Sequence, residues 1–312
     1  MKRILFTTCL MFSLLFLGFS AFAQKVETEG EMFAKISRLT QTKKVDDQEK
    51  AYKLGKIFLQ KFGTGNSPEV KKIKDFVANY EMVALGKMVE EDKTAEAFTF
   101  GKQVLITNPD NSHTTMVLAY AGYQALVKKQ DKTFSKDSIF YAQMTLRLFA
   151  ENKLPQTFLP FENQTVATAL MYYIIGNFSI DNDMNEAANN FYKAVQLESK
   201  IKAEAKPYYI IALNYHTIYW KLAADFESKY PSGTTETDAS RAANEKLEKL
   251  LNRMMDAYAR AIKLGEAQKL PDAANWKTIF SQIYIGFNQS EAGMNEYLDK
   301  ILTTPMQDPS TL

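Results

Sequence analysis

Apolar residues recur at three- and four-residue steps along almost all of the chain beyond Gln24. In the segment 184–198, for example, Met184, Ala187, Phe191 and Val195 form one apolar stripe with polar residues between them. Such spacing is typical of amphipathic helices, because every third or fourth side chain returns to the same helix face. No segment alternates with period two, so the sequence predicts an all-α protein without a sheet.

Proline, glycine and polar capping residues divide this pattern into segments of helix length. Ser67-Pro68, for example, offers a capping hydroxyl followed by a proline at the first helical position, where its missing N–H costs nothing. The sequence predicts twelve helices, over residues 28–40, 47–62, 68–90, 93–107, 112–129, 136–151, 164–180, 184–201, 206–229, 237–265, 273–287 and 290–303.

A small residue recurs in these helices at nearly constant spacing. Ala51, Ala97, Ala142 and Ala187 are about 45 residues apart, and the segments 51–62 and 97–108 align without a gap. Each period holds two helices, and a helix pair cannot bury its apolar stripe alone. The pattern therefore predicts about six antiparallel helix pairs stacked into a curved rod with one concave face.

This arrangement of helix pairs resembles that of tetratricopeptide repeat proteins. In that family a Leu-Gly-like pair marks the first helix, an alanine, an aromatic residue and a second alanine mark the second, and a proline often ends the unit. The residues that match this pattern are Ile175-Gly176, Ala187, Phe191 and Ala194, then Leu85-Gly86, Ala97 and Pro109, and in part Tyr258, Ala261 and Ile262. The period of about 45 residues exceeds the usual 34. The resemblance implies a right-handed α-solenoid whose first helices line a concave groove.

The N-terminus has the three parts of a secretory signal peptide. Lys2 and Arg3 precede an apolar run, and Ala21-Phe22-Ala23 supplies the small residues of a cleavage site. The run of about 16 residues is shorter than the roughly 20 that span a bilayer. We therefore expect a cleaved signal peptide (1–23), which takes the lone Cys9 with it. A tetratricopeptide-like domain (24–303) and a disordered tail (304–312) follow, in a protein exported to the bacterial periplasm or beyond the cell.

Charge and motifs exclude several function classes. Without Lys2 and Arg3, 38 − 2 = 36 basic residues balance 36 acidic ones, which is unlike a nucleic-acid-binding protein. The histidines, His113 and His216, stand in no zinc-binding frame, and we expect His113 to cap a helix start. The calcium-loop-like Asp181–Asn185 reads instead as a turn between helices, because the expected glycine and closing glutamate are absent. The sequence therefore predicts no enzyme activity, no cofactor and no metal.

Tyrosines and other aromatic residues gather on the expected first helices of the pairs, and suggest where a partner binds. By the family resemblance, Asn177, Tyr173 and Lys87 face the groove; Tyr123, His216 and Trp220 are candidates from helix position only. An asparagine in a groove can hold a peptide backbone with its paired donor and acceptor. Two functions stay open: a scaffold that binds a protein or peptide, and a binding protein whose aromatic rings stack on a small molecule or glycan.

Overall fold

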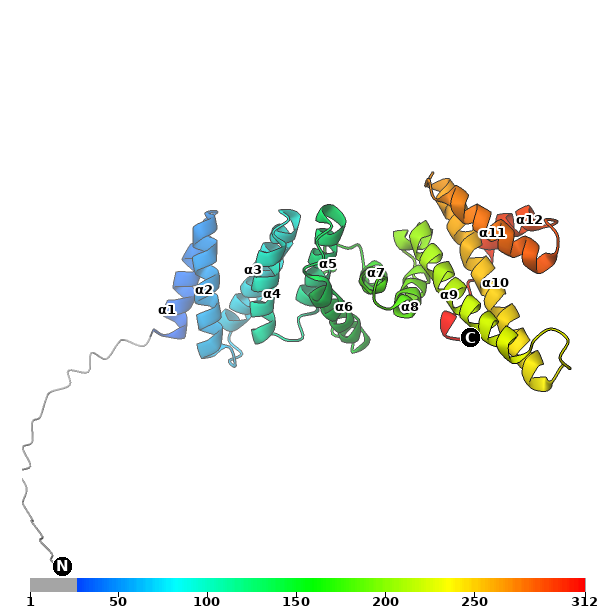
Figure 1. Ribbon diagram of the computed structural model, residues 1–312. Coiled ribbons are helices and arrows are strands. Elements are labelled where there is room, and N and C mark those ends of the chain that lie inside the picture. The colour runs from blue at the N-terminus through cyan, green and yellow to red at the C-terminus, as the bar shows by residue number, and fades with distance from the viewer. Residues whose placement is uncertain (1–26, 312) are drawn as a thin grey trace, which may run out of the picture. The chain divides into compact units, whose positions relative to one another are not determined.

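The structure is a computed structural model that describes residues 27–311. This part of the chain contains twelve α-helices, three short 3₁₀ helices and no strand (Figure 1). The helices are α1 (Glu29–Thr40), α2 (Val45–Phe62), α3 (Pro68–Glu90), α4 (Thr94–Thr107), α5 (Ser112–Lys129), α6 (Ser135–Ala150), α7 (Gln164–Ser179), α8 (Met184–Val195), η1 (Lys200–Ala203), α9 (Ala205–Lys229), α10 (Asp238–Ala267), α11 (Ala273–Asn288), α12 (Met294–Lys300), η2 (Ile301–Thr303) and η3 (Pro309–Thr311).

The predicted all-α fold is confirmed, and each of the twelve expected helices is present. The largest differences in extent are at α8, which ends at Val195 instead of 201, and at α12, which begins at Met294 instead of 290. Among the described residues, no helix combines the length and the apolar character that crossing a bilayer requires. The predicted signal peptide and Cys9 lie outside the described residues.

The chain divides into two compact units, with the boundary between Tyr80 and Glu81 inside α3, where the sequence suggested one domain over 24–303. In the first unit, α1, α2 and the first part of α3 enclose a core of Met32, Ile36, Ala51, Phe58, Val70, Ile73 and Val77. Gly55 lies at a close helix contact there, since an added Cβ would come within 2.9 Å of Val77 Cγ2.

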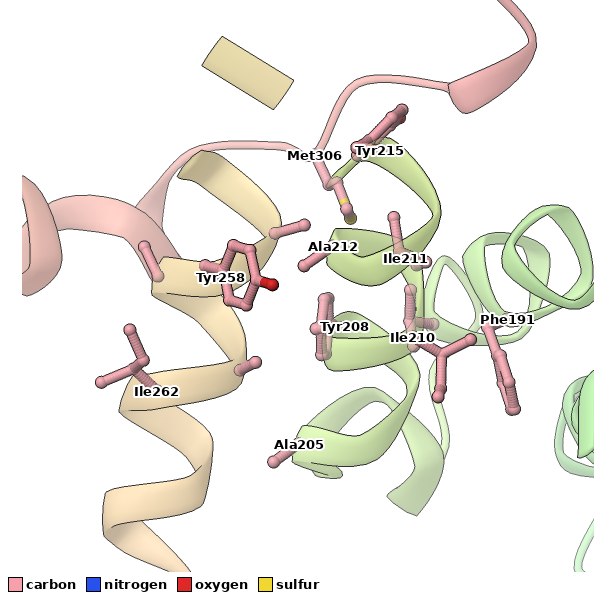
Figure 2. Close-up of a cluster of buried hydrophobic side chains, with 14 of the residues drawn as sticks. Phe191, Ala205, Tyr208, Ile210, Ile211, Ala212, Tyr215, Tyr258, Ile262 and Met306 are labelled. Atoms are coloured by element: carbon pink, nitrogen blue, oxygen red, sulfur yellow. The ribbon is translucent and has the colours of Figure 1, made fainter. Parts of the chain in front are cut away.

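In the second unit each helix packs on its neighbours in the sequence. The pairs α5–α6, α7–α8 and α9–α10 make extensive contacts, and the helices of successive pairs, such as α8 and α9, pack as well. Figure 2 shows part of the largest core of this unit, where Ile210, Ile211 and Tyr215 of α9 lie between α8 and α10. The apolar faces of successive pairs are thus buried against one another, as the sequence predicted for helix pairs that cannot bury these faces alone.

The regularly spaced small residues occupy equivalent buried places. Ala51, Ala97, Ala142 and Ala187, on α2, α4, α6 and α8 respectively, are all 0% exposed. Gly101, which aligns with Gly55, also lies at a close contact, because a Cβ there would come within 2.8 Å of Leu118. The internal similarity of the sequence thus marks positions where neighbouring helices approach too closely for a larger side chain.

Two further local expectations can be compared with the structure. Asp183 accepts a hydrogen bond from the backbone N–H of Glu186 at 2.9 Å and caps α8, so residues 181–183 form a turn between helices, as expected, while Met184 and Asn185 already belong to α8. His113 does not cap α5, because Asn111 accepts the bond from Thr114 N. Its Nε2 instead donates to the Leu159 carbonyl at 3.0 Å, so His113 holds the loop before α7.

The C-terminal segment differs from the expected disordered tail. Residues 304–311 lie along α10, with Met306 buried in the core of the second unit and η3 against α8. Arg253 and Arg260 of α10 bind main-chain carbonyls of this segment. The sequence of residues 304–311 did not predict these contacts, because the arginines that bind the segment are more than 40 positions away in the chain.

Candidate binding groove

The six candidate residues lie in three separate places of the second unit. Tyr123, Tyr173 and Asn177 belong to one polar group, in which Tyr173 is buried and the other two are partly buried. Lys87 lies in a groove beside α3 and α5, and His216 and Trp220 lie in a groove formed by α9, α10 and α11. The single continuous groove implied by the resemblance does not bring them together.

We call the first group the tyrosine cluster; it comprises Tyr123, Tyr173, Asn177, Glu204 and Lys206. The Tyr173 hydroxyl donates to Glu204 Oε2 at 2.7 Å, and its ring meets those of Tyr123 and Phe191 edge to face. Tyr173 is only 6% exposed. Its ring is therefore part of the core and is closed to a partner, contrary to our expectation.

Asn177 uses both ends of its amide within the cluster. Its Nδ2 donates to the Tyr173 carbonyl at 2.8 Å, and its Oδ1 accepts from Lys206 Nζ at 2.6 Å. The paired donor and acceptor that made Asn177 a candidate for holding a peptide are thus occupied by its own chain. The amide joins α7 to the start of α9.

Burial governs the electrostatics of the cluster. Loss of water raises the pKa of Tyr173, with the Tyr123 hydroxyl and the Glu204 carboxylate adding to the shift. Burial, then Glu204, also raises the pKa of Tyr123. Partial desolvation lowers the pKa of Lys206, which Glu204 opposes. Both tyrosines therefore stay protonated at neutral pH, and the Tyr173 hydroxyl donates to Glu204, which suits a structural link between α7 and the start of α9.

Lys87 lines an open groove of about 770 Å³, which we call the loop groove. Its walls are the end of α3, the α5 residues Val117, Tyr120 and Gln124, and the loop residues Leu159 and Pro160. The Lys87 ammonium lies 3.7 Å from the Glu91 carboxylate. The side chain thus borders a groove as expected, with its charge balanced by a neighbour one turn away.

A second open groove of about 770 Å³, the terminal groove, lies between α9, α10 and α11. It is lined by His216, Tyr219, Trp220, Asn244, Leu247, Glu248, Leu251, Met254, Ile279, Gln282, Ile283, Gly286 and Phe287. On α10 and α11 these residues follow one another at three- and four-residue steps, so each helix presents one face to the groove. The apolar part of that lining comes from all three helices.

Trp220 is the most exposed aromatic side chain of the terminal groove. It is 63% exposed, and its ring centroid lies 6.1 Å from that of His216, one turn earlier on α9. His216 Nδ1 lies 3.3 Å from the hydroxyl of Tyr258, which is buried on α10. Burial lowers the pKa of His216 and raises that of Tyr258 to about 12. At neutral pH, therefore, an uncharged imidazole and an exposed indole face the groove together.

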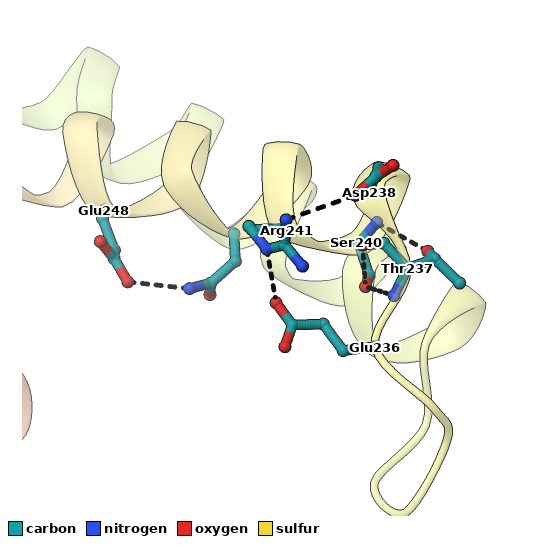
Figure 3. Close-up of polar contacts among 7 residues, drawn as sticks. Glu236, Thr237, Asp238, Ser240, Arg241 and Glu248 are labelled. Carbon is teal, nitrogen blue, oxygen red and sulfur yellow. Dashed lines mark hydrogen bonds and ion pairs between the residues drawn. The ribbon is translucent and has the colours of Figure 1, made fainter.

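Glu248 is the charged side chain of this lining, and its position is fixed by a neighbour. Asn244 Nδ2 donates to Glu248 Oε1 at 2.8 Å along α10. Figure 3 shows the start of this helix, where Thr237 and Ser240 cap each other and Arg241 pairs with Glu236 and Asp238. The arginine is thereby engaged by carboxylates near the cap, and the groove itself carries one acidic group and no basic one.

The sequence did not predict the residues of α10 and α11 that line the terminal groove. Leu247, Leu251 and Met254 of α10, with Ile279 and Ile283 of α11, carry most of the apolar lining. The apolar spacing of both helices was visible, but it does not say which apolar residues face a core and which face an open groove. Gly286 was a usable signal, because a glycine within a helix costs stability unless a close approach or an open surface favours it.

Comparison with protein-family models, with curated proteins and with solved structures gives no match. Within the part of the chain that the structure describes, no three His, Cys, Asp or Glu side chains gather as metal ligands would.

Proposed function

We propose that the protein is a non-enzymatic exported scaffold of the bacterial envelope, a right-handed tetratricopeptide-like solenoid that binds a protein or peptide partner. We place the binding site in the terminal groove, with His216 and Trp220 in its lining. The partner is a segment of a protein, and neither a cofactor nor a nucleic acid takes part. The export signal expected at residues 1–23 supports location in the periplasm or outside the cell, without stable membrane insertion after cleavage.

The observation that carries the proposal is the exposed Trp220 above an open, largely apolar groove. Large apolar surfaces left in contact with water are typical of sites that a partner covers. Tryptophan is among the residues that contribute most to binding free energy at interfaces. The groove extends from Asn244 to Met254 along α10, which is about 15 Å at 1.5 Å per residue. That length suits about three turns of an amphipathic helix.

The lining also suggests the chemistry of the partner. Apolar residues outnumber polar ones, and Glu248 supplies the charge. An amphipathic segment with apolar residues at i, i+4 and i+7 and a basic residue at its edge would satisfy both features. We therefore expect a partner helix with Leu-, Ile- or Phe-rich spacing and a lysine or arginine opposite Glu248.

Two glycines allow a matched test. Gly286 lines the terminal groove and Gly86 the loop groove, and a Cβ at either position meets no atom within 4 Å. We expect Gly286→Leu to fill the terminal groove and abolish partner binding, while Gly86→Leu leaves binding unchanged. A photo-crosslinking residue at Phe287 in the envelope would identify the bound segment, with the same residue at the exposed Ile106 as control. Binding that survives Gly286→Leu would refute the assignment of the groove.

A glycan is the second candidate, because Trp220 and Tyr219 lie near the polar groups Asn244, Glu248 and Gln282. Aromatic faces with amide and carboxylate partners can bind sugars. Titration of the purified protein with oligosaccharides, followed by the heat of binding in a calorimeter, distinguishes the two functions. A saturable change with sugars, lost in Trp220→Ala, would favour the glycan over the peptide.

A further inference from the structure

The C-terminal segment 304–311, which we call the tail, is bound in the manner of a peptide ligand. Arg260 donates to the Thr304 carbonyl at 2.7 Å, and Arg253 donates to the carbonyls of Asp308 and Thr311 at 3.1 Å. Between these points the Met306 side chain enters the core beside Tyr215 and Ala212 (Figure 2). Main-chain contacts at both ends and one apolar anchor between them are the usual elements of extended peptide recognition.

The receptor face is built into α10. Arg253 and Arg260 are seven residues apart, so two helical turns place them on the same side, about 10 Å from each other. Both are at most 9% exposed, which is rare for arginine. The Asp256 carboxylate holds the Arg260 guanidinium at 2.7 Å and thereby orients it. Because the tail starts at Arg260 and ends at Arg253, it runs antiparallel to α10.

The tail does not fill its site completely. A cavity of about 230 Å³ remains beside it, lined by Tyr215, Asn252 and Tyr297 together with the tail residues Pro305 and Gln307. The buried hydroxyl of Tyr215 has no hydrogen bond of ordinary geometry among the described residues, although the nearby Arg253 guanidinium opposes the rise of its pKa on burial. A buried polar group without a partner is costly, so another segment that supplied an acceptor there would bind better.

We propose that this arginine face is a second peptide-binding site, distinct from the terminal groove, and that the tail is its releasable internal occupant. The partner is an extended segment of another protein that offers carbonyls to Arg253 and Arg260, an apolar side chain at the Met306 position and an acceptor to Tyr215. Once the tail leaves, the Arg253 guanidinium loses its acceptors on Gln307, Asp308 and Thr311, whereas Arg260 keeps the Asp256 carboxylate; the loss at Arg253 favours refilling the site. The tail thus keeps the site closed until such a segment displaces it.

The test uses the full chain and a fluorescent peptide with the sequence of residues 303–312. Met306→Asp should release the tail, because a carboxylate cannot occupy the apolar anchor position. We expect this variant to bind the peptide in trans at least about tenfold more tightly than the wild type, whose own tail competes at high effective concentration. Leu302→Asp is the matched control, since Leu302 is exposed just before the tail, and it should bind no better than the wild type.

Three further arms make the result decisive. Adding Arg253→Ala to the released chain should abolish peptide binding, and so should Met306→Asp in the peptide. A second released chain, with residues 304–311 replaced by glycine and serine, repeats the test with a different change; circular dichroism checks the fold of each. The proposal is wrong if folded released chains bind the peptide no better than wild type, or if binding persists without Arg253. It also fails if neither released chain folds, because the tail is then an obligatory part of the core.

Discussion

The tyrosine cluster and the terminal groove use similar side chains on the first helices of successive pairs, yet they have opposite properties. Tyr173 on α7 is buried, and its hydroxyl donates to Glu204. Trp220 on α9 is exposed, and apolar side chains of α10 and α11 lie below it without covering it. Aromatic content alone therefore does not distinguish a core from a binding surface; what decides is whether the next helix closes over the ring.

The difference arises from the chain that follows each first helix. After α7, the short helix α8 and the start of α9 bring Phe191, Glu204 and Lys206 against Tyr173 and Asn177. After α9, the 30-residue helix α10 is followed by α11 with only 16 residues, so α11 packs against only part of α10. Four predictions use this contrast, in order of decreasing effect.

The largest effect is expected from removing the ring of Tyr173. Tyr173→Ala leaves a cavity beside Phe191 and an unpaired Glu204, so we expect a loss of about 3–5 kcal/mol in the free energy of unfolding. Trp220→Ala should cost less than about 0.5 kcal/mol, because the indole is exposed. Urea denaturation followed by circular dichroism measures both values. If the two variants lose equal free energies of unfolding, Tyr173 is no more a core residue than Trp220, and the contrast between the tyrosine cluster and the terminal groove is wrong.

The reverse ranking is expected for partner binding. Trp220→Ala should weaken binding of the segment captured in the terminal groove by about 2 kcal/mol, which is roughly 30-fold in Kd. Asn177→Ala should leave this affinity unchanged, because the amide is used inside the tyrosine cluster. Isothermal titration calorimetry with the captured segment provides the comparison. If Asn177→Ala weakens binding, Asn177 does belong to the binding surface and the prediction is wrong.

A smaller effect tests the polar part of the cluster. Tyr173→Phe keeps the ring but leaves the Glu204 carboxylate without its donor, and we expect a loss of about 1–2 kcal/mol in unfolding free energy. Glu204→Gln should cost less, because the amide oxygen can still accept from the Tyr173 hydroxyl. Thermal denaturation of the three chains is sufficient to rank them. If Tyr173→Phe unfolds at the wild-type temperature, the hydroxyl contributes nothing to the fold.

The smallest effect is a pH dependence in the terminal groove. Burial holds the pKa of His216 below its usual 6.5, so the unfolded chain binds this proton more readily than the folded one. Stability from this group is therefore complete above pH 6.5 and is lost as the pH falls toward the folded-state pKa. NMR titration of the His216 ring should show a midpoint below 6.5, and His216→Gln should flatten the loss of stability between pH 7 and 5. A midpoint above 6.5 would contradict the burial of this ring beside Tyr258.

Local chemistry made much of the fold predictable. Apolar spacing located all twelve helices, and the alanines at steps of about 45 residues marked buried positions on α2, α4, α6 and α8. For the candidate site the result was partial: His216 and Trp220 share a groove, whereas the polar groups of Tyr173 and Asn177 are hydrogen-bonded to other residues of the chain. A helical period shows that residues share a face of a helix, but it does not show what covers that face.

The sequence by itself determined the helix positions and the absence of strands in the described residues, because these depend on the spacing of residues a few positions apart. Only the tertiary structure decided that Glu204 closes the tyrosine cluster, that α10 and α11 leave Trp220 open, and that Arg253 and Arg260 hold the tail. These outcomes depend on residues about 30 to 60 positions apart in the chain. Their proximity is fixed by the packing of whole helices, which no local pattern encodes.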